Sequence, residues 1–140
     1  MADHPFAREF VALLGATQQA YEKRQLDTYL AGFAPEYRSV ILGTPGQEDF
    51  TGLRKKIARD LERFDLLEMR FTLLDEWYAG ETGFAHLQYR TRLRDEHGRE
   101  IIDQRRNIIV GRHLGDGRWQ ILSKIVVEAH TEVLERRPHG

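Results

Sequence analysis

Residues 85–94 read Ala-His-Leu-Gln-Tyr-Arg-Thr-Arg-Leu-Arg, an alternation of side chains that favour a dry environment with side chains that favour water. Successive side chains of a β-strand point to opposite faces of its sheet, so a period of two predicts a strand with one dry and one wet face. Leu87, Tyr89 and Thr91 form the dry row of this strand.

The same period of two occurs on both sides of this stretch. Leu67–Leu73 precedes it, and Ile101–Arg112 and Trp119–Glu128 follow it. The three links between these segments carry residues typical of hairpin turns; they are Gly80–Gly83, Asp95–Gly98 and Gly115–Gly117. Strands of this length must bend to wrap one layer of helices, so residues 66–127 predict a curved antiparallel meander.

The first half of the chain has a helical period instead. Apolar residues recur every three or four positions within 6–23, 26–33 and 51–65, and Pro35 and Thr51 provide a stop signal and an N-cap. A short strand, Tyr37–Leu42, lies between the last two of these helices. We therefore predict one α+β domain over residues 1–140, a curved antiparallel sheet forming a cone with three N-terminal helices packed on its concave face. The tail from about residue 131 is expected to fray.

The composition excludes several classes of function. A net charge of −1 provides no field to attract nucleic acid, and no apolar run approaches the roughly 20 residues of a membrane helix. Cysteine is absent and the six histidines are scattered, so we predict no disulfide, no metal site and no cofactor. The absence of cysteine and of a secretion signal favours the cytoplasm.

The order of elements resembles the nuclear-transport-factor-2-like superfamily. The resemblance rests on Leu26–Phe33 before Pro35-Glu36-Tyr37, and on the ending Asp116-Gly117-Arg118-Trp119-Gln120-Ile121-Leu122. Asp95, Gly98-Arg99 and Gln104 are similar to the association domain of calcium/calmodulin-dependent kinases and to SnoaL-like bacterial proteins. The resemblance implies a cone-shaped fold, in which a pocket and dimerisation through the sheet are common.

Residue-by-residue comparison with that superfamily limits what is carried over. The pocket arginines of the kinase association domains are replaced here by Tyr89, Ile109 and Val126, so their anion-binding role is not carried over. The position of the catalytic base in the superfamily's steroid isomerases is occupied by Ile41. The resemblance therefore implies a pocket but none of these known mechanisms.

The candidate catalytic residue is Asp103. Asp103, Arg105 and Asn107 lie at alternate positions of one predicted strand, so they share a face. If this face lines the cone, Asp103 is a candidate general base, with Arg105 and Asn107 as ligand-binding residues. Alternatively, Ile102, Gln104, Ile108 and Val110 face inward and the polar row faces solvent or a partner.

Other candidate ligand-binding residues are aromatic or apolar. Tyr37, Trp77 and Tyr89 could each present a polar group to a ligand, and Tyr89 and Ile109 occupy pocket positions of the superfamily. We therefore expect a pocket protein that binds, or acts by acid–base chemistry on, a small and largely apolar organic molecule. As an enzyme it would be a cofactor-independent isomerase, cyclase, dehydratase or hydrolase.

The alternative is a non-catalytic association module. Arg90, Arg92 and Arg94 share one face of their strand, and Glu68 and Glu76 lie on the preceding strand. Together these rows could form a self-complementary two-fold interface. We expect a homodimer through the sheet face under either hypothesis.

Overall fold

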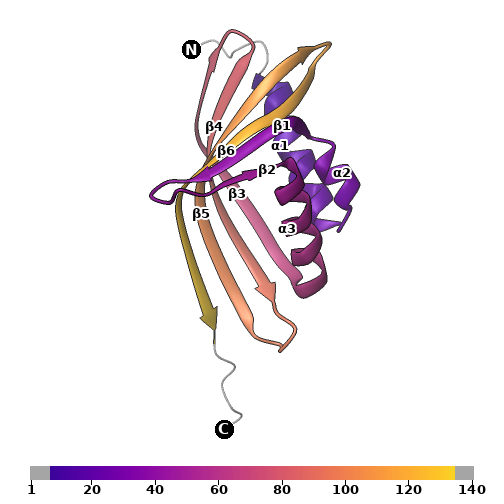
Figure 1. The fold of residues 1–140 in the computed structure, drawn as a ribbon, viewed down its shortest axis with the longest axis vertical. Coiled ribbons are helices and arrows are strands. Elements are labelled where there is room, and N and C mark those ends of the chain that lie inside the picture. The colour runs from indigo at the N-terminus through magenta and orange to yellow at the C-terminus, as the bar shows by residue number, and fades with distance from the viewer. Residues whose placement is uncertain (1–6, 135–140) are drawn as a thin grey trace.

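A computed structural model describes residues 7–134, which contain three helices and one six-stranded sheet. The helices are α1 (Ala7–Glu22), α2 (Leu26–Leu30) and α3 (Phe50–Arg63), and the strands are β1 (Phe33–Ile41), β2 (Gln47–Asp49), β3 (Asp65–Ala79), β4 (Thr82–Arg94), β5 (Glu100–Gly115) and β6 (Arg118–Leu134). The sheet is curved and all three helices lie on its concave side (Figure 1). The predicted α+β class and cone-like arrangement are confirmed. The first helix was expected to begin near residue 6, which lies outside the described part.

The sheet has the order β2-β1-β6-β5-β4-β3. Strands β3 to β6 form the predicted antiparallel meander, whereas β1 pairs with β6 in parallel. The expectation of an entirely antiparallel sheet is therefore wrong at one position. After β1 the chain passes through β2 and α3 to the far edge of the sheet, so the last strand returns beside the first in the same direction.

Helix α1 is attached to the sheet by the ring of Phe10, which is fully buried. It stacks on Trp119 with ring centroids 4.9 Å apart and contacts the edge of Tyr78. On the sheet side the ring packs against the bare backbone of Gly83 and Gly111, where a Cβ atom would collide with it. Two glycines on neighbouring strands thus provide the space for one aromatic side chain.

Two boundaries differ from the prediction in the segment before α3. Helix α2 ends at Leu30, and β1 begins at Phe33, so Pro35 lies inside a strand. The pairing of β1 with β6 is irregular between Phe33 and Arg38, which accommodates a residue without a backbone N–H. The short strand β2 was not predicted because its sequence, Gln47–Asp49, is wholly polar.

The N-cap of α3 is Asp49 and not Thr51. The Oδ1 atom of Asp49 accepts a hydrogen bond of 2.8 Å from the backbone N–H of Gly52. Asp49 has extended backbone angles, as an N-cap requires, whereas Thr51 already lies in the first turn.

The last strand is longer than predicted. Residues 131–134 were expected to fray, but they pair with Glu100–Asp103 as the end of β6. These residues are ordered because they continue the antiparallel pairing of β6 with β5. Residues 135–140 lie outside the described part. Within residues 7–134, no helix has the length and hydropathy needed to cross a membrane.

Candidate functional site

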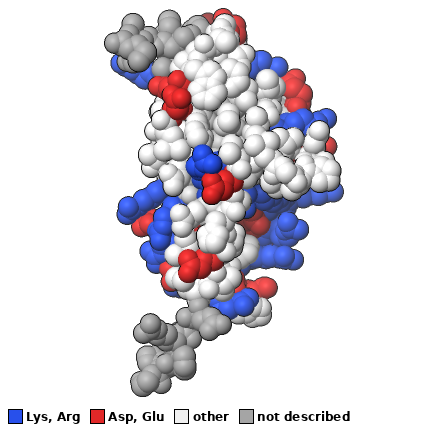
Figure 2. Space-filling model, turned by 90° about the vertical axis from the view of Figure 1, so that its left-hand side faces the viewer, with Lys and Arg blue, Asp and Glu red and all other residues white. Residues whose placement is uncertain are grey.

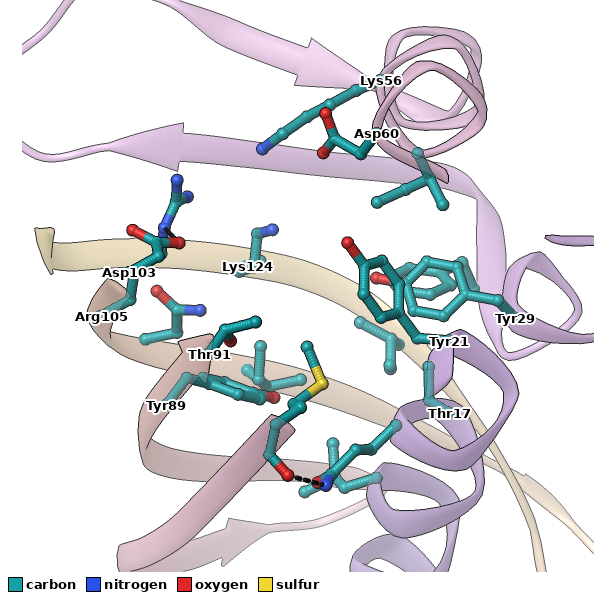
Figure 3. Close-up of a pocket in the computed structure, with 18 of the residues that line it drawn as sticks. Thr17, Tyr21, Tyr29, Lys56, Asp60, Tyr89, Thr91, Asp103, Arg105 and Lys124 are labelled. Carbon is teal, nitrogen blue, oxygen red and sulfur yellow. Dashed lines mark hydrogen bonds and ion pairs between the residues drawn. The ribbon is translucent and has the colours of Figure 1, made fainter. Parts of the chain in front are cut away.

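A cavity of about 180 Å³ lies between the helices and the concave face of the sheet. The residues that line it are Leu14, Thr17, Gln18 and Tyr21 of α1, Tyr29 of α2, Phe33 of β1, Lys56, Ile57 and Asp60 of α3, Met69 of β3, Tyr89, Thr91 and Leu93 of β4, Asp103, Arg105, Asn107 and Ile109 of β5, and Ile121 and Lys124 of β6. Figure 3 shows the polar groups entering this space from opposite sides. The site therefore depends on all three helices and on five strands.

The inward face of β5 carries the polar row Asp103, Arg105 and Asn107. Each residue is paired across to an inward-facing residue of β4, namely Thr91, Tyr89 and Leu87. All three members of the row line the cavity. Of the two orientations considered from the sequence, the structure has the one in which this row lines the cone, and the alternative row lies on the outer face.

Asp103 is fixed by contacts on both of its carboxylate oxygens. Arg105 Nε donates a hydrogen bond of 2.9 Å to Oδ2, and Thr131 Oγ1 donates one of 3.1 Å to Oδ1. The side chains of Asp103 and Arg105 are 22% and 29% exposed, so the pair still borders the open part of the cavity. A carboxylate oriented in this way keeps free lone pairs that can accept a proton or a hydrogen bond from a ligand.

Two of the predicted ligand-binding residues do not line the cavity. Tyr37 is fully buried in the core, with its ring 5.0 Å from that of Phe33 and perpendicular to it. Trp77 points to the outer face of the sheet, where it is 42% exposed and stacks on Phe84. Placing these two in the pocket is wrong because Tyr37 is enclosed by the core, and because a register shift between Leu73 and Asp75 reverses the alternation along β3 and turns Trp77 outward. Tyr89, Arg105, Asn107 and Ile109 do line the cavity.

Lys124 is the main cavity residue that sequence reasoning missed. Strict alternation from Trp119 and Ile121 would turn Ser123 inward and Lys124 outward. The pairing of β6 with β5 shifts between Ile121 and Ser123, which is a β-bulge, and the shift reverses the facing of the residues that follow. Lys124 therefore points into the cavity, where Figure 3 shows it between the Asp103–Arg105 pair and the tyrosines.

The ammonium group of Lys124 is in an unfavourable environment for a charge. Burial lowers its pKa to about 8, and the nearby cations Lys56 and Arg105 add to this effect. Glu48 and Asp103 oppose it. An amine with this pKa is partly neutral at physiological pH, unlike an ordinary surface lysine.

Helix α3 contributes a second carboxylate, Asp60, which sequence reasoning also missed. Burial raises the pKa of Asp60, while the positive charges of Lys56 and Arg59 oppose the rise. Lys56 and Asp60 are four residues apart and lie beside the apolar stripe that includes Ile57, so both reach the edge of the cavity. The sequence signal that could have placed Lys56 and Asp60 at the cavity was their position beside the apolar stripe of the helix.

The tyrosines of the cavity are neutral hydrogen-bonding groups. Burial raises the pKa of Tyr21 to about 12, with a further contribution from the negative charges of Asp60 and Asp103. Burial also raises the pKa of Tyr29 and of Tyr89 well above 10. Each phenol therefore keeps its proton and remains available as a donor to a ligand.

The amide of Asn107 has unused hydrogen-bonding capacity. Its side chain is 5% exposed, and its Oδ1 atom is buried without a hydrogen-bond partner among the described residues. Buried polar atoms of this kind are usually satisfied in proteins. A donor group of a ligand or a water molecule would satisfy this oxygen. No group of three or more potential metal ligands of the His, Cys, Asp or Glu type occurs within the described residues.

Comparison with known proteins identifies the fold. No protein-family model matches the chain, and no curated protein matches it in sequence. Among solved structures, a ketosteroid isomerase-like protein from Erwinia carotovora atroseptica is 12% identical, with a TM-score of 0.73 over 96% of this chain and 100% of that one.

Two further structures have the same fold. A type 2 hexachlorocyclohexane dehydrochlorinase is 13% identical, with a TM-score of 0.73 over 91% of this chain and 88% of its own. A putative calcium/calmodulin-dependent kinase II association domain from Exiguobacterium sibiricum is 9% identical, with a TM-score of 0.70 over 98% and 99% of the two chains. The chain thus has the nuclear-transport-factor-2-like fold that the sequence resemblance implied. Identities this low establish the fold alone.

Proposed function

We propose that this protein binds a small, largely apolar carbonyl compound in its cavity and removes a proton from the carbon next to the carbonyl group. The observation that carries the proposal is the inward row of Asp103, Arg105 and Asn107, which faces a cavity whose other walls are mostly apolar and aromatic. A small number of polar groups that converge in an otherwise apolar cavity is typical of a small-molecule site.

The size of the cavity limits the ligand. A volume of about 180 Å³ is below the range of roughly 300–1,000 Å³ for drug-sized ligands. An engineered protein cavity of about 150 Å³ holds one benzene molecule. The ligand would therefore be about the size of one six-membered ring with a small substituent.

In this proposal Asp103 is the general base, and neutral hydrogen-bonding groups polarise the carbonyl. The hydrogen bonds from Arg105 and Thr131 hold the carboxylate in one orientation. The phenol of Tyr89 and the amide of Asn107 lie on the same inward face and would donate to the carbonyl oxygen. Similarity to a ketosteroid isomerase-like protein and to a dehydrochlorinase is consistent with enzymatic chemistry in a fold of this kind.

Exchange of the α-hydrogens of cyclohexanone in D₂O, followed by NMR, tests this proposal without knowledge of the natural substrate. We expect the protein to accelerate exchange, and Asp103→Asn to reduce the acceleration by about 100-fold or more, the usual range for removal of a general base. The matched control is Asp116→Asn, because Asp116 is exposed in the β5–β6 turn and asparagine tolerates its positive φ of 55°. Exchange that survives Asp103→Asn would show that Asp103 is not the base.

A second candidate function is self-association through the outer face of the sheet. Trp77, Phe84, Ile108, Val110 and Ile125 face outward on four adjacent strands and form a partly exposed apolar patch. Figure 2 shows a broad uncharged area on this side of the molecule. Two of the three arginines in the row are already paired within the chain, since Arg90 and Arg92 lie 3.8 and 2.7 Å from Glu68 and Glu100. The apolar patch therefore supports a homodimer better than the charged rows do.

A further inference from the structure

Lys124 has a position that a structural role does not explain. It lies on β6 between Ser39 of β1 and Ile109 of β5, in the middle of the sheet and on its concave face. It lines both the main cavity and an adjoining hollow under β2. Its ammonium makes no hydrogen bond or ion pair with any residue in 7–134. A lysine placed on a buried face without a partner costs stability, so its presence calls for a function.

The surroundings of Lys124 favour the neutral amine. The charged and titratable groups around it are Lys56 and Asp60 from α3, Glu48 from β2, Asp103 and Arg105 from β5, and the phenols of the cavity. Asp103 is already paired with Arg105, so it cannot serve Lys124 as an exclusive counter-ion. Desolvation together with neighbouring cations is the usual means by which proteins activate a lysine as a nucleophile.

We propose that Lys124 forms an imine with aldehydes and ketones that enter the cavity. This inference rests on the proposed function, because it requires that the cavity admit a carbonyl compound. It adds the covalent step and restricts the ligand class to reactive carbonyl compounds.

The chemistry of this step needs no co-reactant apart from water. The lone pair of the neutral amine attacks the carbonyl carbon, and transfer of a proton from nitrogen to oxygen gives a carbinolamine. A proton from solvent converts the hydroxyl group to water, which leaves as the nitrogen lone pair forms the C=N bond. The protonated imine withdraws electrons from the adjacent carbon, so that a C–H bond there loses its proton to Asp103 more readily than in the free ketone.

Reductive trapping with benzaldehyde and sodium cyanoborohydride at pH 7.5 tests the imine directly. The chain has only four lysines, Lys23, Lys55, Lys56 and Lys124, so the site of benzylation can be mapped by mass spectrometry. At this pH about a quarter of an amine with a pKa of 8 is neutral, against roughly 0.1% of an ordinary lysine. We expect Lys124 to react at least about tenfold faster than each of the other three, with half-maximal reactivity near pH 8.

Matched variants decide the outcome. Lys124→Met should abolish the fast phase, whereas Lys55→Met, which removes an exposed lysine of α3 outside the cavity, should retain it. Lys124→Arg provides a second test that keeps the positive charge, with folding of each variant checked by circular dichroism. Equal rates at all four lysines, or fast labelling mapped to a lysine that persists in Lys124→Met, would refute the imine; labelling of the α-amino group, which has an ordinary pKa near 8, is mapped separately. The imine would also be refuted if benzoate stabilised the wild-type protein but not Lys124→Met, while benzaldehyde gave no trapped adduct at Lys124.

The exchange experiment separates this inference from the proposed function. Benzaldehyde has no α-hydrogen, so trapping reports only on imine formation. Cyclohexanone exchange without trapping would leave the proposed function intact and refute the imine alone. Failure of both would refute both.

Discussion

At the scale of single residues, Lys124 gives the clearest link between the site and stability. Its pKa is lowered from 10.5 to about 8 in the folded protein, so the unfolded chain binds more protons between these two values. Stability therefore rises with pH across this window, and below pH 8 the buried charge destabilises the fold.

We expect Lys124→Met to raise the free energy of unfolding in urea at pH 6.5. The gain should shrink as the pH increases from about 8 to about 10.5, because the wild-type amine then loses its charge in both states. Lys55→Met is the control, since Lys55 is exposed on α3. A gain that is the same at pH 6.5 and pH 10 would contradict a buried, titrating Lys124.

The residues of the site were only partly predictable from the sequence. Alternation along β5 placed Asp103, Arg105 and Asn107 on one face, and the structure decided which face. Lys124 was not predictable, because one extra residue in the β6 bulge reverses the alternation and no local sequence signal marks it. Trp77 was misplaced for the same reason, because a register shift after Leu73 reverses the alternation along β3 and turns it outward.

At the scale of elements, the attachment of α1 depends on two glycines that face Phe10. A Cβ atom at Gly83 would lie 2.9 Å from the Phe10 ring, and one at Gly111 would lie closer still. The ring cannot retreat easily because it stacks on Trp119.

We expect Gly111→Ala to lower the free energy of unfolding by about 1–3 kcal/mol, the usual cost of overpacking a core. Gly15→Ala is the matched control, because no atom lies within 4 Å of its Cβ position in the middle of α1. That change should instead stabilise the helix by about 0.5–1 kcal/mol. Equal effects of the two substitutions in urea denaturation would show that Phe10 does not depend on the bare backbone.

Element types were more predictable than their ends. The change from a helical period to a period of two gave three helices and four long strands, as observed in residues 7–134. The boundaries depended on contacts that a local pattern does not contain. Asp49 caps α3 through its hydrogen bond to Gly52, and β2 and residues 131–134 become strands only because neighbouring strands pair with them.

At the scale of the whole molecule, we predict that the protein associates with itself through the outer face of the sheet. We expect a concentration-dependent dimer in sedimentation velocity. Ile108→Lys, in the centre of the apolar patch, should shift it to monomer, because an unpaired charge at an interface core costs several kcal/mol. Leu114→Lys adds the same charge to an exposed leucine away from this patch and should leave the dimer intact. A dimer that tolerates Ile108→Lys would contradict association through this face.

The overall fold could be predicted because long amphipathic strands must bend around a helical layer, and this requirement is satisfied by few architectures. The parallel pairing of β1 with β6 was not predictable, since it joins segments about 85 residues apart (Ser39 to Lys124). The cavity depends on the position of β6 between β1 and β5, because β6 brings Lys124 beside the inward row of β5.

The central claim is that the concave face of the sheet presents Asp103 to a ring-sized ligand. A crystal of the protein soaked in cyclohexanone tests it most directly. We predict density for one ring between Tyr89, Asp103 and Lys124, with its carbonyl carbon near or bonded to the lysine nitrogen. A cavity closed by side chains, or cyclohexanone bound only on the outer surface, would contradict the account.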